Sequence, residues 1–537
     1  MSRTNGTPKT SLSAFSTLVV AGPLILAGCS ETTPETTEVA PSEPAVVSEA
    51  PSYSAVLKPV LDAEGEVNGI AVDAVLSGGL AEDQARLQLM APVVYVMVDG
   101  IADRIMDLEV TDEAGDIEFT TEDGDPVPGG FPYFRTWTAT RDVSFPVEIS
   151  YTSLVQPAGS RNGPAFGIRP SDGGVSGAGA GFMLVPSNVD SQTNYLSWDL
   201  SEFDDDAIGV STFGDGAAEF SGAPAAMMQG WYMAGPAGRY PTDYEDHPFK
   251  GFWLGEFPYD VEAELEFTSH MYDFLSTHFT HLDPVPDYRV FLRQLDTPPY
   301  GGATALANSF MLSRGPAREE EYGKEGPRQT FTHEMLHQFV GGINESHGNA
   351  TWFLEGLTTF YEYTMPFRAG EIDQDAYVDG LNHLSNIYYT NPGREMSAQA
   401  IVEVGFNDGD IRHVPYQRGA FYFADLDTRI REASDGQRSL DDLMERVLNG
   451  REDGSLDLTI ENWAAEAAKE TGADELSIVR RVNLDGELFV PSAEAFGSCV
   501  AGEPSVFVLE DGTEVSGISW KKASDMNGQA CFAVAAE

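Results

Sequence analysis

The spacing of hydrophobic residues divides this 537-residue chain into a strand-rich first part and a helix-rich second part. In residues 53–236, short runs such as "PVVYVMVDG" and "FPVEISYTSLVQP" lie between Pro, Gly and Asp positions, which is typical of strands. The segment "RIMDLEVTDEAGDIEFTTEDG" alternates apolar and polar residues on both sides of a glycine-bearing turn and predicts a hairpin. Because no convincing helical period occurs in this part, we predict an N-terminal β-sandwich-like domain over residues 53–236.

The period changes to that of α-helices in residues 237–489, which we predict to form a mostly helical domain. Two glycines end one of its helices, and Ser439 with Asp442 forms a capping pattern at the start of another. A strand is predicted at residues 287–296, and a loop with an edge strand at residues 300–312. The helices are predicted at residues 260–282, 328–342, 351–365 and 439–450. Strands and helices therefore fall in separate regions, and the fold class is α+β with more than one domain.

The first 52 residues do not belong to this pattern. Residues 1–28 combine two basic residues with an apolar stretch too short for a stable membrane anchor, which predicts a signal peptide. The sequence Leu26-Ala27-Gly28-Cys29 resembles the lipobox of bacterial lipoproteins, and this resemblance implies cleavage before Cys29 and attachment of lipid to it. The alternative is an ordinary signal peptide with an incidental cysteine. Residues 29–52 are rich in Pro, Glu, Thr and Ser and predict a disordered tether.

These features predict a lipid-anchored protein of the bacterial cell envelope. Ser30 follows the modified cysteine, where an aspartate is associated with retention in the inner membrane. We therefore expect anchoring in the outer membrane, facing either the periplasm or the exterior.

The cysteines fit an oxidising compartment. With Cys29 lipidated, Cys499 and Cys531 remain as a pair, and we predict a disulfide between them. The alternative is two buried free thiols. The disulfide would close a small C-terminal segment, residues 490–537, where the sequence returns to strands and turns.

The charge excludes one class of function. The formal net charge is -54 at pH 7, which excludes a nucleic-acid-binding protein that works by neutralising phosphates. A solvated acidic surface explains this charge without any special partner. A basic substrate is compatible with it but is not required.

The segment "FTHEMLHQFVGG" at residues 331–342 carries the first chemical signal. His333 and His337 are four residues apart, so both imidazoles project from one face of a helix and can reach one Zn²⁺ ion. Glu334 lies about 100° around the helix from His333, where it can act as a general base on water without binding the metal. The alternative is a helix that carries two histidines by chance.

A catalytic zinc site needs a third ligand. Glu355 follows His337 by seventeen residues within "TWFLEGLTTFYEY", and "WFLEG" resembles the W-x-x-E-G element that carries the third ligand in the aminopeptidase N superfamily of gluzincins. His347 is a rival ligand, although an exposed loop histidine is the simpler interpretation. Glu362 lies two helical turns after Glu355 on the same face and could support a ligand, but we expect it to be solvated.

Hydrolysis of a peptide bond also needs a donor for the developing oxyanion. The sequence "HVPYQRG" resembles the gluzincin element V-P-Y-x-K-G, whose tyrosine has that role. The resemblance assigns the role to Tyr416. Arg418 stands where the family usually has lysine.

The order of these parts resembles the glycyl aminopeptidase family, which is related to aminopeptidase N. The resemblance covers roughly residues 53–480 and is strongest at residues 328–448, where "LDTRIREASDGQRSLDDLMERVL" follows the tyrosine element. It implies a thermolysin-like catalytic domain behind an N-terminal β domain, one Zn²⁺ ion and peptide substrates.

The sequence departs from the family in three ways. The spacing before Glu355 is nearer that of aminopeptidase N, and too few residues follow residue 490 for the family's C-terminal PDZ domain. The family element Y-G-G-x-E-H carries a glutamate that binds the substrate's amino group, whereas Gly301 and Gly302 are followed here by Ala303 and Thr304. The backbone of these four residues could still bind an extended peptide.

The sequence therefore predicts a zinc metallopeptidase in which His333, His337 and Glu355 bind the metal, Glu334 transfers protons and Tyr416 stabilises the oxyanion. An aminopeptidase-like enzyme with altered N-terminus recognition and an endopeptidase of the same fold are both compatible with Thr304. A non-catalytic lipoprotein that binds peptides or proteins is a further alternative, but it would need neither Glu334 nor Tyr416. Nothing in the sequence points specifically to hydrolysis of esters or epoxides.

Overall fold

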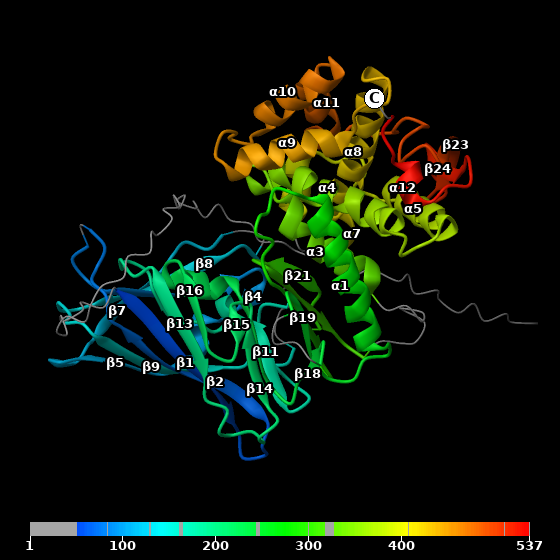
Figure 1. Ribbon diagram of the computed structural model, residues 1–537. Helices are drawn as coiled ribbons and strands as arrows, with labels where there is room; N and C mark the ends of the chain where they lie inside the picture. The colour runs from blue at the N-terminus through cyan, green and yellow to red at the C-terminus, as the bar shows by residue number, and fades with distance from the viewer. Residues whose placement is uncertain are drawn as a thin grey trace, which may run out of the picture.

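The computed structural model describes residues 51–535, apart from residues 83, 128–129, 160–164, 243–246, 299, 317–326, 406–407 and 510 (Figure 1). The predicted signal peptide, Cys29 and nearly all of the predicted tether lie outside the described residues. Within the described part, no helix has both the length and the apolar composition needed to cross a membrane. The chain forms a β-rich N-terminal part and a helical C-terminal part, which confirms the predicted fold class.

Three sheets form the β-rich part. The largest has seven strands, and their order places β1 in its interior, antiparallel to β2 and parallel to β13. In spatial order its strands are β16 (Ala218–Ser221), β13 (Thr193–Trp198), β1 (Ser52–Leu61), β2 (Val67–Leu76), β9 (Val147–Leu154), β5 (Ile105–Asp112) and β6 (Gly115–Asp116).

Two five-stranded sheets complete this part. One contains β12 (Val185–Pro186), β3 (Gln88–Tyr95), β8 (Tyr133–Ala139) and β7 (Phe119–Asp123), with β4 (Val98–Asp99) paired to β3. The other contains β10 (Arg169–Ser171), β11 (Gly174–Ala178), β17 (Trp231–Gly235), β14 (Ile208–Ser211) and β15 (Gly214–Asp215). The predicted hairpin is correct for β5 and β6. β7 instead pairs with β8, because an alternating pattern does not specify which sheet a strand joins.

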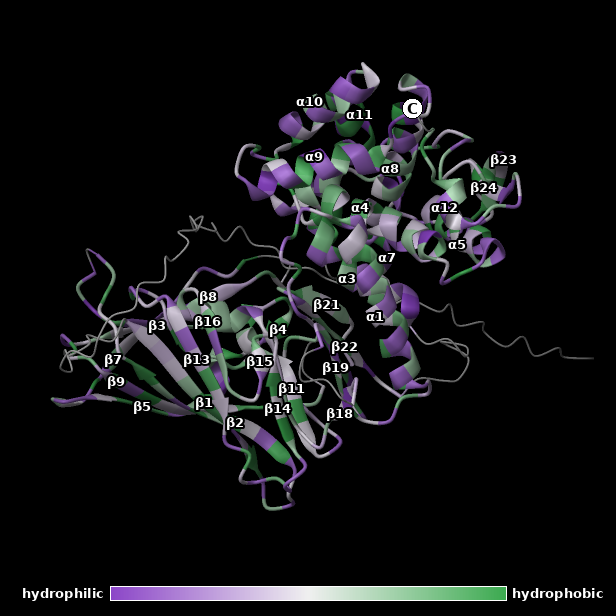
Figure 2. Cartoon of the chain, in the orientation of Figure 1, coloured by the Kyte–Doolittle hydropathy of each residue, from purple (hydrophilic) through white to green (hydrophobic). Residues whose placement is uncertain are grey.

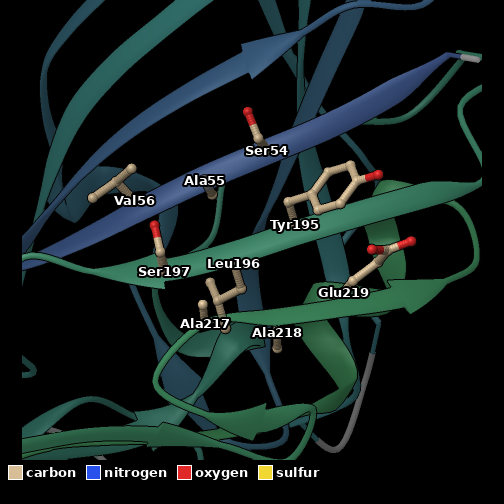
Figure 3. Close-up of a pocket in the computed structure, with 9 residues that line it drawn as sticks. All are labelled: Ser54, Ala55, Val56, Tyr195, Leu196, Ser197, Ala217, Ala218 and Glu219. Atoms are coloured by element: carbon tan, nitrogen blue, oxygen red, sulfur yellow. The ribbon is translucent and has the colours of Figure 1, made fainter. Parts of the chain in front are cut away.

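The large sheet has one buried face and one solvated face. Tyr53, Ala55 and Leu57 of β1 point into the core, as the two-residue period requires. On the opposite face, a shallow groove crosses β1, β13 and β16, and Figure 3 shows Val56 and Tyr195 among the residues that line it. Both side chains are exposed.

A further five-stranded sheet belongs to both hydrophobic cores. Its order is β18 (Gly238–Tyr240), β19 (Phe249–Leu254), β20 (Tyr288–Gln294), β22 (Ser309–Arg314) and β21 (Ala303–Leu306). Phe291 and Met311 pack into the core of the β-rich part, whereas Val290, Leu292 and Phe310 pack into the core of the helical part. Successive residues of a strand point to opposite faces, so this sheet holds the two parts together.

The helical part is built around two long helices, α4 (His347–Ala369) and α8 (Val414–Ala433). Figure 2 shows that the outward turns of α9 and α10 are largely hydrophilic, as expected for helices on the surface of this part. The other helices of this part include α1 (Val261–His278), α3 (Arg328–Val340), α5 (Gln374–Tyr389), α6 (Ala398–Val404), α7 (Gly409–Arg412), α9 (Leu440–Glu452), α10 (Ile460–Thr471) and α11 (Glu475–Val479).

Two glycines let α4 and α8 touch through their backbones. A Cβ atom added to Gly356 would lie 2.5 Å from the Cα atom of Gly419. A Cβ atom added to Gly419 would lie 2.3 Å from the carbonyl oxygen of Trp352. Any side chain at either position would force the two helices apart.

The C-terminal segment packs against α5. It contains the hairpin of β23 (Val500–Val508) and β24 (Glu514–Lys522), followed by α12 (Gly528–Cys531). A disulfide joins Cys499 to Cys531. The Gln374 side chain donates to the carbonyl oxygens of Cys499 and Ser524, so the disulfide-closed segment is fixed to the start of α5.

Several predicted boundaries are wrong, including those of α4, of residues 300–312 and of α9. α4 begins at His347, four residues earlier than predicted, because Gly348 and Asn349 have low helix propensity and hide the first turn. Residues 300–312 hold two strands: β21 is the edge strand and β22 lies inside the sheet. α9 was predicted to end at Gly450, but it continues to Glu452. At its start, the predicted capping box of Ser439 and Asp442 is present. The predicted domain limits at residues 236 and 489 stay predictions.

Candidate metal centre and active site

Helices α3 and α4 bring three potential metal ligands together. Nε2 of His333 lies 3.3 Å from Oε2 of Glu355, and Nε2 of His337 lies 3.5 Å from the same oxygen. The ligand atoms of the three residues all lie within 4.8 Å of one another. All three residues are placed by helices: the histidines are four residues apart on α3, and Glu355 lies two turns into α4.

These separations fit Zn²⁺. Two ligands about 2.1 Å from a tetrahedral Zn²⁺ are about 3.4 Å from each other, which matches the 3.3 Å and 3.5 Å separations. Two imidazole nitrogens and one carboxylate oxygen also form a donor set typical of catalytic zinc.

Contacts to the other ring nitrogens turn both Nε2 atoms toward this group. Nδ1 of His333 donates to Oε2 of Glu362 over 2.7 Å. The Thr358 hydroxyl donates to the carbonyl oxygen of Leu354, so at 3.4 Å from Nδ1 of His337 its oxygen is left to accept from the ring. Nε2 is therefore the nitrogen that each ring presents to a metal, and on His333 a metal would take the place of a proton.

The prediction that Glu362 is solvated is wrong. Its side chain is only 11% exposed and is held by His333. Sequence reasoning missed Thr358 altogether. The available signal was the helical spacing of Glu355, Thr358 and Glu362 at i, i+3 and i+7, which places all three on one face of α4.

The electrostatic surroundings suit a positive charge at this place. Burial lowers the pKa of His333, but hydrogen bonds with the carboxylates of Glu355 and Glu362 outweigh burial and raise the pKa to about 10. Burial lowers the pKa of His337 well below its usual value, and the neighbouring His333 lowers it further. The carboxylates thus stabilise one positive charge among buried groups, as they would for a bound cation.

Glu334 and Tyr416 lie beside the three ligands. Glu334 is fully buried, and its backbone oxygen accepts a hydrogen bond from Tyr288. The Tyr416 ring stacks on the His333 ring with centroids 5.9 Å apart, and its hydroxyl hydrogen bonds to Glu355. Burial raises the pKa of Tyr416 well above its usual value, and the charge of Glu355 raises it further. The phenol is therefore protonated and can act as a hydrogen-bond donor.

The Gly-Gly element lies on the edge of the shared sheet. Gly301 has a φ of +88°, and Gly302 accepts a backbone hydrogen bond from Ser313. Ala303 and Thr304 begin β21. The Thr304 side chain is fully buried, and its hydroxyl donates to the carbonyl oxygen of Ala303 over 2.6 Å. This position therefore offers no negative charge for a substrate amino group.

Two residues considered from the sequence lie away from the ligand group. The His347 ring contacts Phe131 edge-on, with centroids 5.1 Å apart, and is not among the clustered ligands. Arg418 is 1% exposed and donates to the carbonyl oxygens of Arg394 and Met396, so it has a structural role.

A helix with HExxH, a glutamate on the next helix and a preceding β-rich part together define the class of gluzincin peptidases. Residues 328–418, which contain all of these ligands and Tyr416, match the sequence profile of the M61 glycyl aminopeptidases. This match supports the resemblance to the glycyl aminopeptidase family that the motifs of the segment predict.

A solved structure shows the same fold over more of the chain. An aminopeptidase N family protein from Idiomarina loihiensis matches with a TM-score of 0.65 and 14% identity, over 86% of this chain and 81% of that protein. Yeast LTA4 hydrolase in complex with bestatin matches with a TM-score of 0.49 and 11% identity, over 81% and 67% of the respective chains. The comparison with curated proteins gave no significant match.

Proposed function

We propose that this protein is a zinc-dependent peptidase. The observation that carries the proposal is the grouping of two Nε2 atoms and one carboxylate oxygen beside a buried glutamate and a protonated tyrosine. His333, His337 and Glu355 would hold the Zn²⁺ ion. A bound Zn²⁺ supplies Lewis-acid chemistry, since it polarises a carbonyl group and lowers the pKa of water beside it.

The other side chains have roles in proton transfer and charge stabilisation. The Glu334 carboxylate takes the proton of the attacking water and then delivers it to the leaving amine. The Tyr416 hydroxyl donates a hydrogen bond to the oxyanion of the tetrahedral intermediate. Glu362 and Thr358 orient the two imidazoles through their Nδ1 atoms.

The test of this function is Glu334→Gln. The amide keeps the size of the side chain but cannot accept a proton, so we expect hydrolysis to fall by about 10²- to 10⁴-fold. Zinc content, measured on the same samples by elemental analysis, is expected to stay at one ion per chain. Undiminished hydrolysis by a zinc-loaded Glu334→Gln protein would contradict the mechanism.

An unbiased peptide library determines which bonds are cut. An aminopeptidase would release single residues from free N-termini, and acetylation of the same peptides would abolish cleavage. The buried Thr304 favours a second candidate, an endopeptidase, because the position offers no anion for an ammonium group. In that case, acetylated and free peptides would be cut at the same internal bonds. A zinc-loaded protein that only binds the peptides would support a non-catalytic role.

We also propose that lipid on Cys29 anchors the protein in the outer membrane of a bacterial envelope. The proposal rests on the lipobox-like sequence, which lies outside the described residues. Mass spectrometry of the mature N-terminus would detect the modification. We expect Cys29→Ala to leave the protein unlipidated and to release it from the membrane fraction.

A further inference from the structure

The turn before α8 contains Arg412 and His413, four and three residues before Tyr416. Arg412 is the last residue of α7, and His413 links α7 to α8. Nη2 of Arg412 lies 3.1 Å from Nε2 of His413. The His413 ring in turn meets the Tyr416 ring edge-on, with centroids 5.0 Å apart and planes at 88°. These contacts connect Arg412 to Tyr416 through one imidazole.

The hydrogen-bonding capacity of arginine fixes the state of this imidazole. A guanidinium group carries only donors, so Nε2 of His413 must accept and must be unprotonated. A neutral imidazole with an accepting Nε2 carries its proton on Nδ1. Arg412 therefore selects one tautomer of His413 and one orientation of its ring.

The backbone of His413 is fixed as well. The residue is 9% exposed, and its carbonyl oxygen accepts the backbone N–H groups of Tyr416 and Gln417. Burial lowers the pKa of His413, and the charge of Arg412 lowers it further, which agrees with the neutral ring that the Arg412 contact requires. Its edge contacts one side of a phenol whose face stacks on His333.

We infer that Arg412 and His413 are positioning residues for Tyr416: the Arg412 guanidinium holds the His413 ring, and this ring fixes the Tyr416 hydroxyl where the oxyanion forms. The inference rests on the proposed function, because it assigns an effect on the reaction to residues that act only through Tyr416. It also explains why an arginine stands in the turn before α8. Misplacement of an oriented catalytic group by about 1 Å costs about 10²-fold in rate.

The kinetic test combines Arg412→Met with Tyr416→Phe in the zinc-loaded, full-length protein. Methionine keeps length but donates no hydrogen bond, so we expect kcat to fall by about 10- to 100-fold with KM changed by less than about 3-fold. Arg412→Lys retains a donor and is expected to recover part of the loss. In the Tyr416→Phe background, Arg412→Met is expected to cost less than about 3-fold more, because its effect passes through the missing hydroxyl.

A matched control separates this effect from the loss of a positive charge. Arg480 is an exposed arginine that pairs with Glu461 on the surface, and Arg480→Met is expected to leave kcat unchanged. The inference is overturned if Arg412→Met has no effect on kcat, or if it costs the same factor with and without the Tyr416 hydroxyl.

A spectroscopic measurement tests the geometry without using activity. Long-range ¹H–¹⁵N spectra distinguish the two tautomers of each of the nine histidines. His413, assigned through His413→Gln, is expected to be protonated on Nδ1 in the unmodified protein and to change tautomer in Arg412→Met. A His413 that is protonated on Nε2 in the unmodified protein overturns the inference.

The two measurements also separate this inference from the proposed function. If the zinc-loaded protein cleaves no peptide of the library, the proposed function fails and the ring spectra alone decide the geometry. If it cleaves peptides and Glu334→Gln does not, the proposed function holds and the double substitution decides whether Arg412 and His413 act through Tyr416.

Discussion

At the scale of single residues, the contacts at the Nδ1 atoms of His333 and His337 determine how the two rings are oriented for a cation. Glu362 and Thr358 each bind an Nδ1 atom and leave Nε2 facing Glu355. Such contacts orient a ligand and raise its basicity, so a change in them alters metal affinity even though the ligands stay in place.

Glu362→Ala is expected to weaken Zn²⁺ binding by about 10- to 100-fold, because His333 loses the carboxylate that orients it. Competition with a chelator of known affinity measures the change. Glu432, an exposed glutamate near the end of α8, supplies the matched control, since Glu432→Ala removes the same charge far from the imidazole. Equal affinities of the two variants would show that Glu362 does not support the ligand.

His281, which lies outside the site, is expected to make the stability of the protein depend on pH. Burial lowers the pKa of His281 to about 4, and the charge of Arg451 contributes to this shift. The pKa of His281 in the folded protein lies below its value of about 6.5 in the unfolded chain. The contribution of neutral His281 to the free energy of unfolding is therefore complete above pH 6.5 and is lost as the pH falls toward 4. The substitution His281→Gln removes this pH-dependent contribution to the free energy of unfolding.

Urea unfolding at pH 7.5 and at pH 5 provides the measurement. We expect the free energy of unfolding to fall more in the unmodified protein than in His281→Gln, by about 1–2 kcal/mol after allowance for partial exposure of the ring. The same fall in both proteins would mean that His281 titrates alike in the folded and unfolded states.

The ligand residues could be predicted from the sequence because their spacing is local. His333 and His337 are fixed by one turn of helix, and Glu355 by a short motif on the next helix. The contacts of Glu362, Thr358 and His413 could not be predicted in the same way, although helical spacing places the first two on the face of α4 that carries Glu355. Each depends on a contact between different helices or on the geometry of a turn, and glutamate, threonine and histidine are common on solvated surfaces.

At the scale of secondary structure elements, the crossing of α4 and α8 sets the distance between Glu355 and Tyr416. Gly356 follows the ligand directly, and Gly419 lies one turn after the tyrosine, so the contact point of the helices lies beside both functional residues. The spacing of the two side chains therefore depends on backbone contact.

Gly419→Ala is expected to separate the helices, because the new methyl group would lie 2.3 Å from the carbonyl oxygen of Trp352. Overpacking of this kind costs about 1–3 kcal/mol in the free energy of unfolding. We also expect hydrolysis to fall while zinc remains bound. Thermal unfolding and peptide cleavage measure the two effects. Gly342→Ala is the control, because a Cβ atom there would meet no atom of the described residues within 4 Å.

Patterns of single elements predicted the helices better than the strands of the shared sheet. The helix at residues 328–342 ends at its two glycines as predicted. The segment 300–312 was predicted as a loop with one edge strand but contains most of a hairpin whose second strand is buried. The reason is that β22 is covered on both faces, so its residues show no alternation that marks it as a strand of the interior.

At the scale of the whole molecule, one buried arginine joins the β-rich part to the shared sheet. Arg293 of β20 donates to the carbonyl oxygens of Ala165, Gly167 and Ser176, and to the hydroxyl of Ser313. Burial lowers its pKa to about 9, and the nearby Arg169 contributes. The guanidinium is therefore charged at pH 7 and satisfies three carbonyl groups of the N-terminal part.

Arg293→Met is expected to lower the free energy of unfolding by about 3 kcal/mol or more, because several buried acceptors lose a charged donor together. Arg293→Lys should restore only part of the loss, since an ammonium group cannot reach acceptors arranged around a planar guanidinium. Chemical denaturation measures both variants, with the exposed Arg480→Met for comparison. A change of less than about 1 kcal/mol would show that water replaces the arginine.

The position of β1 has a mechanical consequence. The strand begins at Ser52, immediately after the residues that precede the described fold, and its backbone is bonded to β2 on one side and β13 on the other. A force applied to the preceding chain along the strand axis would load these hydrogen bonds in shear, so many must break at once. A strand at the edge of the sheet would instead peel away bond by bond. A force on the N-terminal chain is therefore applied to the fold at β1, a strand whose hydrogen bonds to both neighbours resist extension.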